Sequence, residues 1–331
     1  MANPTQKKIF ITRQIPGPGI EMLKAEGFTL AIWPEDRPVP EDVFIQEGKD
    51  SHALVTLTSD RVDTRILDAC KKLELIAQFG AGFDNIDIPA ATRRGIAVSN
   101  TPGAMSEATA DIAFGLMIAV TRKFFYMHKR ILAGGWTHFQ PAANLGVELK
   151  GKTLGIFGLG HIGMEMARRC RGAYQMEILY CNRNRNEEAE QSLGARWVPF
   201  DELLAKSDVL SVHSVLSEET RGIFDRHAFA RMKPGSVFIN TSRGGVHNEE
   251  DLIDALQKGV IWGAGLDVTN PEPMRPDNPL LSMENVCILP HVGSATVEAR
   301  GEMSRMAAAN AISFYRTGKL INPVNPEVIK E

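Results

Sequence analysis

Cysteine is scarce in this sequence, and the few cysteines stand far apart. Four occur in 331 residues, with no C-x-x-C pair and no metal-like pairing with histidine, at Cys70, Cys170, Cys181 and Cys287. Disulfide frameworks belong to short, cysteine-rich secreted chains, and thiolate metal sites need closer spacing. We therefore expect free thiols, no metal site and a cytoplasmic protein.

The sequence also lacks a long apolar run and an excess of charge of one sign. Its longest apolar run, residues 112–120, has nine residues, whereas a membrane-spanning helix needs about 20. The N-terminal apolar stretch Ile9–Ile11 is too short for a signal peptide. A net charge of −3 provides no basic field for nucleic acid. We therefore expect neither a membrane nor a nucleic acid as a partner.

Short apolar runs instead alternate with amphipathic stretches along the whole chain. Strand-like runs occur at residues 7–12, 28–33, 52–57, 73–79, 96–99, 153–158, 176–181, 208–213, 236–240, 261–268 and 286–291. Helix-like stretches lie between most of them, for example at 18–26, 62–71, 88–94, 162–171, 201–206 and 249–258. This alternation predicts the α/β class, with parallel sheets that carry helices on both faces.

Eleven strands are many for one open sheet, and the length of 331 residues suggests about two domains. A long helical stretch from about Ser106 to Ala133 is the natural divider, because Pro102-Gly103 breaks the chain just before it. A second long helix, at about 296–317, follows the last strand, and we expect it to return to the first domain. The predicted domains are residues 1–102 with 293–331, which bind substrate, and residues 103–292, which bind a dinucleotide.

A glycine-rich loop of the form GxGxxG, Gly158-Leu159-Gly160-His161-Ile162-Gly163, lies between a buried strand and a helix. In that context Gly158 permits a tight turn, Gly160 lets the backbone approach a pyrophosphate, and Gly163 lets helix and strand pack closely. The N–H groups of the helix start, at His161 and Ile162, then face the anion. The sequence therefore predicts a dinucleotide site.

The end of the next strand bears on the choice between NAD and NADP. An NAD site usually carries Asp or Glu there, for the ribose hydroxyls. Here the chain reads Asn182-Arg183-Asn184-Arg185, and a guanidinium can grip a 2′-phosphate. We therefore predict NADP in preference to NAD, with Arg183 as the main contact and Asn182 and Arg185 beside it; a plain solvated loop is the alternative for Arg185.

Three later strands end in segments that carry charged side chains. Arg243 follows the strand at 236–240, Glu272 follows 261–268, and His291 follows 286–289. Ligands of open parallel sheets bind beyond the carboxyl ends of the strands. A cation, an acid and a base near a dinucleotide indicate hydride-transfer chemistry.

Together with three further segments, Gly80–Asp84, Glu107–Asp111 and Gly265–Val268, these motifs resemble the D-isomer-specific 2-hydroxyacid dehydrogenases, most closely their glyoxylate/hydroxypyruvate reductase branch. The resemblance implies two doubly wound, Rossmann-like domains with the active site in the cleft between them. It implies NAD(P)H-dependent reduction of a small 2-oxo acid, such as glyoxylate or hydroxypyruvate, to the D-2-hydroxy acid. It also implies a homodimer, formed largely through the helix and loop after Ser106.

The resemblance also assigns roles to individual residues. His291 is the acid/base, Glu272 orients it, and Arg243 binds the substrate. Substrate contacts are further expected at Ala81, Gly82 and Ser294, and cofactor contacts at Thr109, Thr241, Asp267, His291 and Gly293, although a structural role for Asp267 is almost as well supported. Trp136 and Phe139 either pack in the dimer interface or reach a neighbouring active site.

One segment departs from the family, and several alternatives stay open. The family pattern His-x-Pro-Leu reads His213-Ser214-Val215-Leu216 here, which affects a loop beside the cofactor. A 2-oxogluconate-type reductase and a phosphoglycerate dehydrogenase-like enzyme share the motifs. Formate dehydrogenase relatives are disfavoured because they have glutamine where Glu272 stands. A non-enzymatic, dinucleotide-sensing co-repressor scaffold is disfavoured because the acid of an NAD site is missing.

Overall fold

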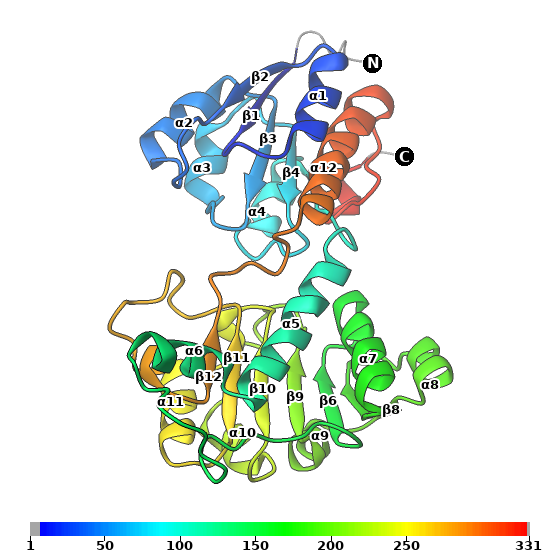
Figure 1. Ribbon diagram of the computed structural model, residues 1–331. Helices are drawn as coiled ribbons and strands as arrows, with labels where there is room; N and C mark the ends of the chain where they lie inside the picture. Colours follow the sequence, from blue (N-terminus) through cyan, green and yellow to red (C-terminus); the bar gives the residue numbers. More distant parts are fainter. Residues whose placement is uncertain (1–6, 330–331) are drawn as a thin grey trace. The chain divides into compact units, whose positions relative to one another are not determined.

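The structure is a computed structural model that describes residues 7–329. The chain forms two compact units: unit 1 comprises residues 1–105 and 295–331, and unit 2 comprises residues 106–294 (Figure 1). Each unit is built on one sheet in which every strand pairing is parallel. The predicted α/β class with two parallel sheets is therefore confirmed.

Unit 1 is a five-stranded sheet of order β2-β1-β3-β4-β5 with helices on both faces. Its strands are β1 (Lys8–Ile11), β2 (Thr29–Ile32), β3 (Ala53–Leu57), β4 (Leu75–Phe79) and β5 (Ala97–Ser99). Its helices are α1 (Gly17–Ala25), α2 (Glu41–Lys49), α3 (Thr64–Ala69), α4 (Ile88–Arg93) and α12 (Val297–Thr317). Ile9 and Ile11 face the core under α1 and α12, while Phe10 between them faces the core under α2, α3 and α4, as the two-residue period of a strand requires.

Unit 2 is a seven-stranded sheet of order β12-β11-β10-β9-β6-β7-β8. Its strands are β6 (Thr153–Phe157), β7 (Glu177–Cys181), β8 (Arg196–Trp197), β9 (Val209–Val212), β10 (Val237–Asn240), β11 (Gly263–Leu266) and β12 (Val286–Ile288). Its helices are α5 (Ser106–Thr121), α6 (Phe124–Leu132), α7 (His161–Tyr174), α8 (Glu187–Leu193), α9 (Phe200–Lys206), α10 (Arg226–Arg231) and α11 (Glu249–Gln257). The strand order reverses between β6 and β9, which is the place where doubly wound sheets bind ligands.

Short polar residues begin many of these helices. A side chain just before the helix accepts hydrogen bonds from first-turn N–H groups at Asp63, Asn186, Asp225, Asn248 and Thr296. All eleven predicted strands are present, whereas the short strand β8 and the helices α2, α8 and α10 were not predicted. The four cysteines are free thiols. No helix within residues 7–329 has the length and apolarity to span a membrane.

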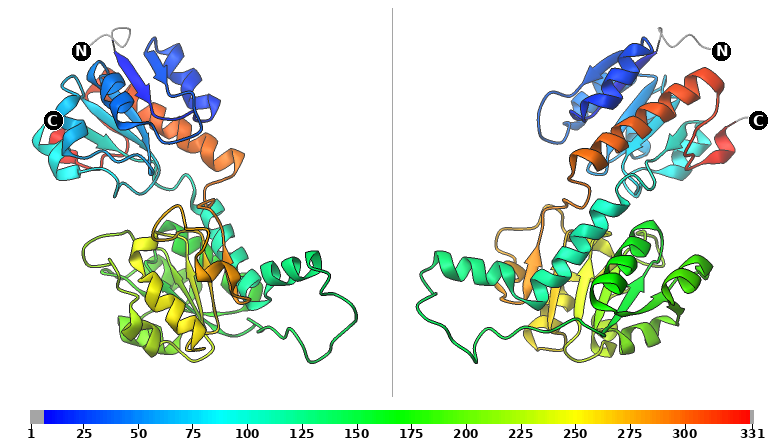
Figure 2. Two further views of the ribbon diagram at one scale, coloured as in Figure 1. Left: turned by 90° about the vertical axis from the view of Figure 1, so that its left-hand side faces the viewer. Right: turned by 45° about the vertical axis from the view of Figure 1, so that its right-hand side comes forward.

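The prediction of one long helix from Ser106 to Ala133 is wrong. The chain turns between α5 and α6 at Lys123, which adopts the left-handed backbone conformation with φ +54°. The ammonium of Lys123 lies 2.9 Å from a carboxylate oxygen of Glu284 and 5.2 Å from the ring centre of Trp262. These contacts hold the break, and α6 with the loop after it projects from the body of unit 2 (Figure 2).

Candidate active site

The candidate site in unit 2 lies at the carboxyl ends of its strands. Arg243, Glu272 and His291 stand in the segments after β10, β11 and β12, which are neighbours in the sheet. Parallel neighbours end at one edge, so the sheet brings together three side chains that lie far apart in the sequence.

His291 and Glu272 form a direct pair. Nδ1 of His291 lies 2.5 Å from Oε1 of Glu272, and their side chains are 33% and 41% exposed. Partial burial raises the pKa of Glu272, but the hydrogen bond and charge of His291 and the charge of Arg243 outweigh it, so the pKa lies below its usual value. Glu272 is therefore a carboxylate at neutral pH, and its Oε1 lies against Nδ1 of the imidazole.

The backbone around His291 is held by the buried Asp267. The N–H of His291 donates to the carbonyl of Asp267 at 2.9 Å, and the N–H groups of Val292 and Gly293 donate to the two oxygens of its carboxylate at 2.8 and 2.7 Å. Burial raises the pKa of Asp267, and these N–H groups partly oppose it. His291 has φ +52°, a conformation uncommon outside glycine. The carboxylate thus fixes the turn that aims the imidazole.

Arg243 is carried on a turn held by Asn240. Nδ2 of Asn240 donates to the carbonyl of Arg243 at 2.9 Å and to Nδ1 of His247 at 3.0 Å, while Oδ1 accepts from the N–H of Ser242 at 2.9 Å. A Cβ on Gly244 would lie 1.9 Å from the carbonyl oxygen of Thr269, so only glycine fits there. The Arg243 turn therefore packs directly on the start of the Glu272 segment.

The glycine loop follows β6, where the strand order reverses. Gly158 has φ +97°, and a Cβ there would lie 2.6 Å from the N atom of Ser214. A Cβ on Gly163 would lie 2.8 Å from the carbonyl oxygen of Gly158, whereas one on Gly160 would meet no described atom within 4 Å. His161 and Ile162 form the first turn of α7. The turn, the open approach and the close packing required by a bound pyrophosphate are all present, so these residues fit a dinucleotide.

The polar side chains of the segment after β7 differ in what they contact. Asn182 bonds both the N–H and the carbonyl of Leu159, at 2.6 and 3.2 Å, and so braces the glycine loop. Nε and Nη2 of Arg185 bond the carboxylate of Glu190 at 2.9 and 2.6 Å. Arg183 is exposed. The pKa of Glu219 lies below its usual value chiefly because its carboxylate accepts hydrogen bonds from Ser217 and from its own backbone N–H, and the charge of Arg183 lowers it further. Of the two arginines in this segment, Arg183 is thus the one for which no carboxylate of the described residues lies within hydrogen-bond distance, whereas Arg185 is held by Glu190.

Thr109 and Thr241 lie close to this machinery. Thr109 is buried in the first turns of α5, and its side chain lies beside Gly293, where a Cβ would meet it at 3.2 Å. The hydroxyl of Thr241 lies 3.4 Å from Nδ1 of His213, a histidine whose pKa burial lowers to about 3. Ser294 is half-buried at the end of unit 2. Thr109 therefore lies beside the turn that carries His291, and Thr241 lies beside His213.

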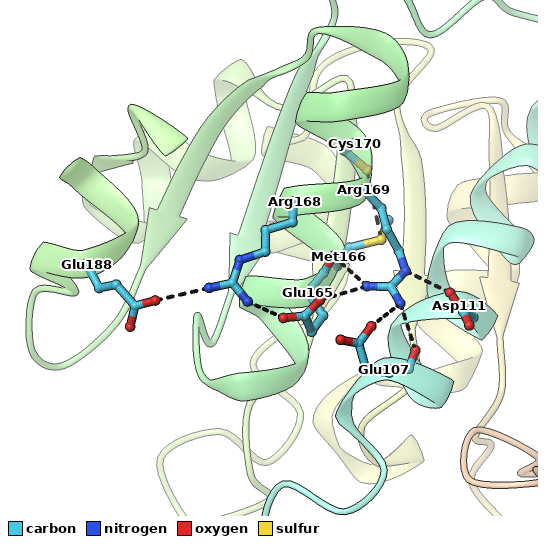
Figure 3. Close-up of polar contacts among 8 residues, drawn as sticks. All are labelled: Glu107, Asp111, Glu165, Met166, Arg168, Arg169, Cys170 and Glu188. Atoms are coloured by element: carbon cyan, nitrogen blue, oxygen red, sulfur yellow. Dashed lines mark hydrogen bonds and ion pairs between the residues drawn. The ribbon is translucent and has the colours of Figure 1, made fainter. Parts of the chain in front are cut away.

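An ion cluster that sequence reasoning missed fixes the first turn of α5 against α7 (Figure 3). The guanidinium of Arg169 bonds Glu107 at 2.5 Å, Asp111 at 2.7 Å and Glu165 at 3.0 Å. Burial lowers the pKa of Arg169, but its three carboxylate partners raise it by more, so the pKa lies above its usual value. The cluster thereby holds the turn that presents Thr109 to Gly293.

Unit 1 carries its own predicted ligand loop, Gly80–Gly82, at the carboxyl end of β4. Ala81 and Gly82 are half-buried, and Gly80 is buried. The sequence analysis missed three buried or half-buried amides: Asn240, which holds the Arg243 turn, and Gln78 and Asn100, which bond the loop Gly80–Gly82. For Gln78 a signal was available, because a glutamine stands inside the apolar strand Leu75–Phe79. No group of three side chains suited to a metal ion occurs within residues 7–329.

Comparisons with known proteins identify the family to which the chain is similar. A model of the D-isomer specific 2-hydroxyacid dehydrogenase NAD binding domain matches residues 114–293. A glyoxylate reductase of Korarchaeum cryptofilum is 43% identical over 324 residues, which cover 98% of this chain and 97% of that protein.

Two solved structures superimpose on nearly the whole chain. A glyoxylate reductase from Paecilomyes thermophila has a TM-score of 0.87 at 37% identity, covering 97% of this chain and 99% of that chain. An NADPH-dependent glyoxylate/hydroxypyruvate reductase from Sinorhizobium meliloti, in complex with NADP and malonate, has a TM-score of 0.83 at 31% identity, covering 98% of this chain and 99% of that chain.

Proposed function

The chain belongs to the D-isomer-specific 2-hydroxyacid dehydrogenase family, and from this premise we propose that it reduces glyoxylate and related small 2-oxo acids, hydroxypyruvate among them, to the D-2-hydroxy acids, with NADPH as the preferred hydride donor. The names of its relatives support this substrate class. The observation that carries the proposal is the His291–Glu272 pair, which stands beside the charge of Arg243 on the sheet that bears the dinucleotide loop.

The chemistry requires a proton at the carbonyl oxygen of the substrate. A bound nicotinamide would supply the hydride. Because Nδ1 of His291 faces Glu272, Nε2 is the nitrogen left to donate a proton to the oxygen that gains negative charge. General acid catalysis of this kind contributes about 10²–10⁴-fold to the rate. Glu272 sets the imidazole orientation and stabilises its charged form.

The carboxylate of the substrate needs its own anchors. We assign Arg243 to it, because a guanidinium matches a carboxylate in shape and charge. The N–H groups of Ala81 and Gly82 are the second anchor, and Ser294 lies at the end of the His291 segment as a further contact. Gly158, Gly160, His161, Ile162 and Gly163 would hold the pyrophosphate; Thr109, Thr241, Asp267 and Gly293 would line the nicotinamide side.

The preference for NADPH rests on the segment after β7. No carboxylate stands at position 182 to repel a 2′-phosphate, and Arg183 is exposed there. Arg185 already binds Glu190 through two hydrogen bonds, so its charge is largely compensated. Arg183 is therefore the principal phosphate contact, and Arg185 acts chiefly by holding the loop.

We further propose a homodimer that forms through α6 and the loop after it. None of the α6 side chains is buried, although the helix is amphipathic. Large apolar side chains are exposed on α6 and on the loop after it: Phe124, Ile131, Leu132, Trp136, Phe139 and Leu145. An apolar surface of this kind marks an interaction site, and a second copy of the chain provides the same surface.

A substrate panel tests the proposed function. Purified protein is assayed with glyoxylate, hydroxypyruvate, 2-oxogluconate, pyruvate and 3-phosphohydroxypyruvate against NADPH and NADH. We expect the highest kcat/KM for glyoxylate or hydroxypyruvate with NADPH. The highest value for 2-oxogluconate or 3-phosphohydroxypyruvate would assign one of the related activities instead. No turnover of any substrate would leave a dinucleotide-binding scaffold.

A further inference from the structure

We propose that Gln78 and Asn100 are positioning residues for the loop Gly80–Gly82: they hold the carbonyl groups of Gly82 and Ala81 toward the protein, so that the N–H groups of the loop and of Phe83 after it form the seat for the substrate carboxylate. The inference rests on the proposed function, because it explains how one anchor of the 2-oxo acid is built. All of its contacts lie inside unit 1.

Three consecutive carbonyl groups of the loop are tied to neighbouring donors. The carbonyl of Gly80 accepts the backbone N–H of Thr101 at 3.0 Å. That of Ala81 accepts Nδ2 of Asn100 at 2.7 Å, and that of Gly82 accepts Nε2 of Gln78 at 3.2 Å. Asn100 therefore orients the peptide group that carries the N–H of Gly82, and Gln78 orients the next peptide group, which carries the N–H of Phe83.

The N–H groups of the same peptides are left over. They belong to Ala81, Gly82 and Phe83, because the carbonyl of one residue shares its peptide group with the N–H of the next. Within residues 7–329, none of these three residues donates its N–H to another group, and all three are half-buried rather than enclosed. Successive N–H groups that point to one side make an anion-binding concavity. A carbonyl turned toward the same place would instead repel a carboxylate. The direction of each peptide thus decides whether the loop binds an anion.

The orientation of the Gln78 amide is determined by its neighbours. Nδ2 of Asn85 donates to the carbonyls of Leu57 and Asp60, at 3.0 and 2.8 Å, so Oδ1 of Asn85 must face Gln78. Nε2 of Gln78 donates to that Oδ1 at 3.0 Å, and Oε1 of Gln78 accepts the hydroxyl of Thr56 at 2.7 Å. A flipped amide would place oxygen against two acceptors.

Gln78 is fully buried, and an amide at this depth is costly unless every bond is made. The other four residues of β4 are apolar and pack in the core, so the strand itself does not require an amide at this position. The amide instead serves the loop: glycine has little intrinsic preference for one peptide direction, and loop direction must come from outside.

Single substitutions test the inference. Gln78→Met keeps the length of the side chain and removes its donor, while Asn100→Ser shortens a half-buried donor at little risk to folding. For each variant we expect KM for glyoxylate to rise about tenfold, kcat to change by less than about twofold, and Kd for NADPH to stay unchanged. Kd for oxamate, an unreactive carboxylate analogue of a 2-oxo acid, should rise by the same factor.

Asn325→Ser is the matched control. Asn325 is a buried asparagine of unit 1 whose side chain bonds the N–H of Val98, the carbonyl of Ile96 and the hydroxyl of Thr92, away from the loop. Its substitution should lower Tm without changing KM or the Kd for oxamate. That difference separates positioning of the loop from general loss of stability.

The outcomes distinguish this inference from the proposed function. If the wild type turns over glyoxylate but both variants keep its KM and oxamate Kd, or lose kcat alone, the inference is overturned and the proposed function stands. If the wild type binds oxamate more tightly than both variants but reduces no 2-oxo acid, the loop assignment holds and the proposed function fails. A wild type that binds no oxamate would overturn the inference.

Discussion

The pair formed by Glu272 and His291 offers the sharpest test of the proposed chemistry. Glu272→Gln keeps an oxygen that can accept the Nδ1 hydrogen, so it removes the charge while preserving the geometry. A charge-assisted hydrogen bond contributes about 1.5–3 kcal/mol when buried. These side chains are 33% and 41% exposed, and the value for solvent-exposed ion pairs is below about 1 kcal/mol. We therefore take about 1–1.5 kcal/mol.

That free energy corresponds to a five- to tenfold lower kcat for reduction at neutral pH, since about 1.4 kcal/mol is tenfold. The assay follows NADPH absorbance with saturating glyoxylate across a pH series. Kd for NADPH, measured by fluorescence, should stay unchanged.

Glu249→Gln is the matched control for this variant. Glu249 anchors the same segment, because its two carboxylate oxygens accept the N–H of Asn270 and Nδ2 of Asn278 at 3.2 and 2.6 Å. A change at Glu249 disturbs the segment without removing the charge next to the imidazole. If Glu272→Gln kept the kcat of the wild type within twofold at every pH, the role given to the pair would be wrong.

Four further outcomes are expected. His291→Ala should lower kcat by about 10²–10⁴-fold with unchanged Kd for NADPH; an unchanged kcat would remove His291 as the proton donor. Arg183→Ala should raise KM for NADPH but not for NADH, and Arg185→Ala should do so less, because Arg185 is held by Glu190; equal effects on both cofactors would refute the phosphate contact. Burial lowers the pKa of His247 to about 4, so the unfolded chain binds more protons than the folded one below about pH 6.5, and unfolding experiments should show about 2 kcal/mol lost from about pH 7.5 to pH 5 that His247→Val does not lose; the same pH dependence in both proteins would contradict this. Leu132→Glu, on the exposed face of α6, should convert a dimer to a monomer in light scattering, and an unchanged mass would exclude α6 from the interface.

Much of the fold could be predicted from the sequence because the patterns that indicate strands and helices are local. Short apolar runs bounded by turns predicted the eleven main strands, and their alternation with amphipathic stretches predicted parallel sheets. The missed elements have weaker local signals: β8 is a two-residue strand, and α8 and α10 are helices of seven and six residues. The break at Lys123 was missed because its partners, Glu284 and Trp262, lie more than a hundred residues away in the chain.

Some features of the site could likewise be predicted from local patterns, and others could not. Glycine spacing and the placement of Arg243, Glu272 and His291 after strands were enough to nominate the main residues, since parallel strands end at one edge. The spacing gave no means of pairing Arg185 with Glu190 or of finding the Arg169 cluster. Such pairings depend on which side chains the crossovers bring together, and several arrangements are compatible with one helix pattern.

The sequence by itself determined the class of fold, the dinucleotide loop and the residue types available for hydride transfer, because backbone conformation and strand-end placement follow from nearby residues. The tertiary structure alone decided that Oε1 of Glu272 meets Nδ1 of His291, that Asp267 holds the turn behind them, and that Gln78 and Asn100 orient the loop Gly80–Gly82. These are contacts between segments separated in the chain, and their geometry follows from how both faces of each sheet are packed.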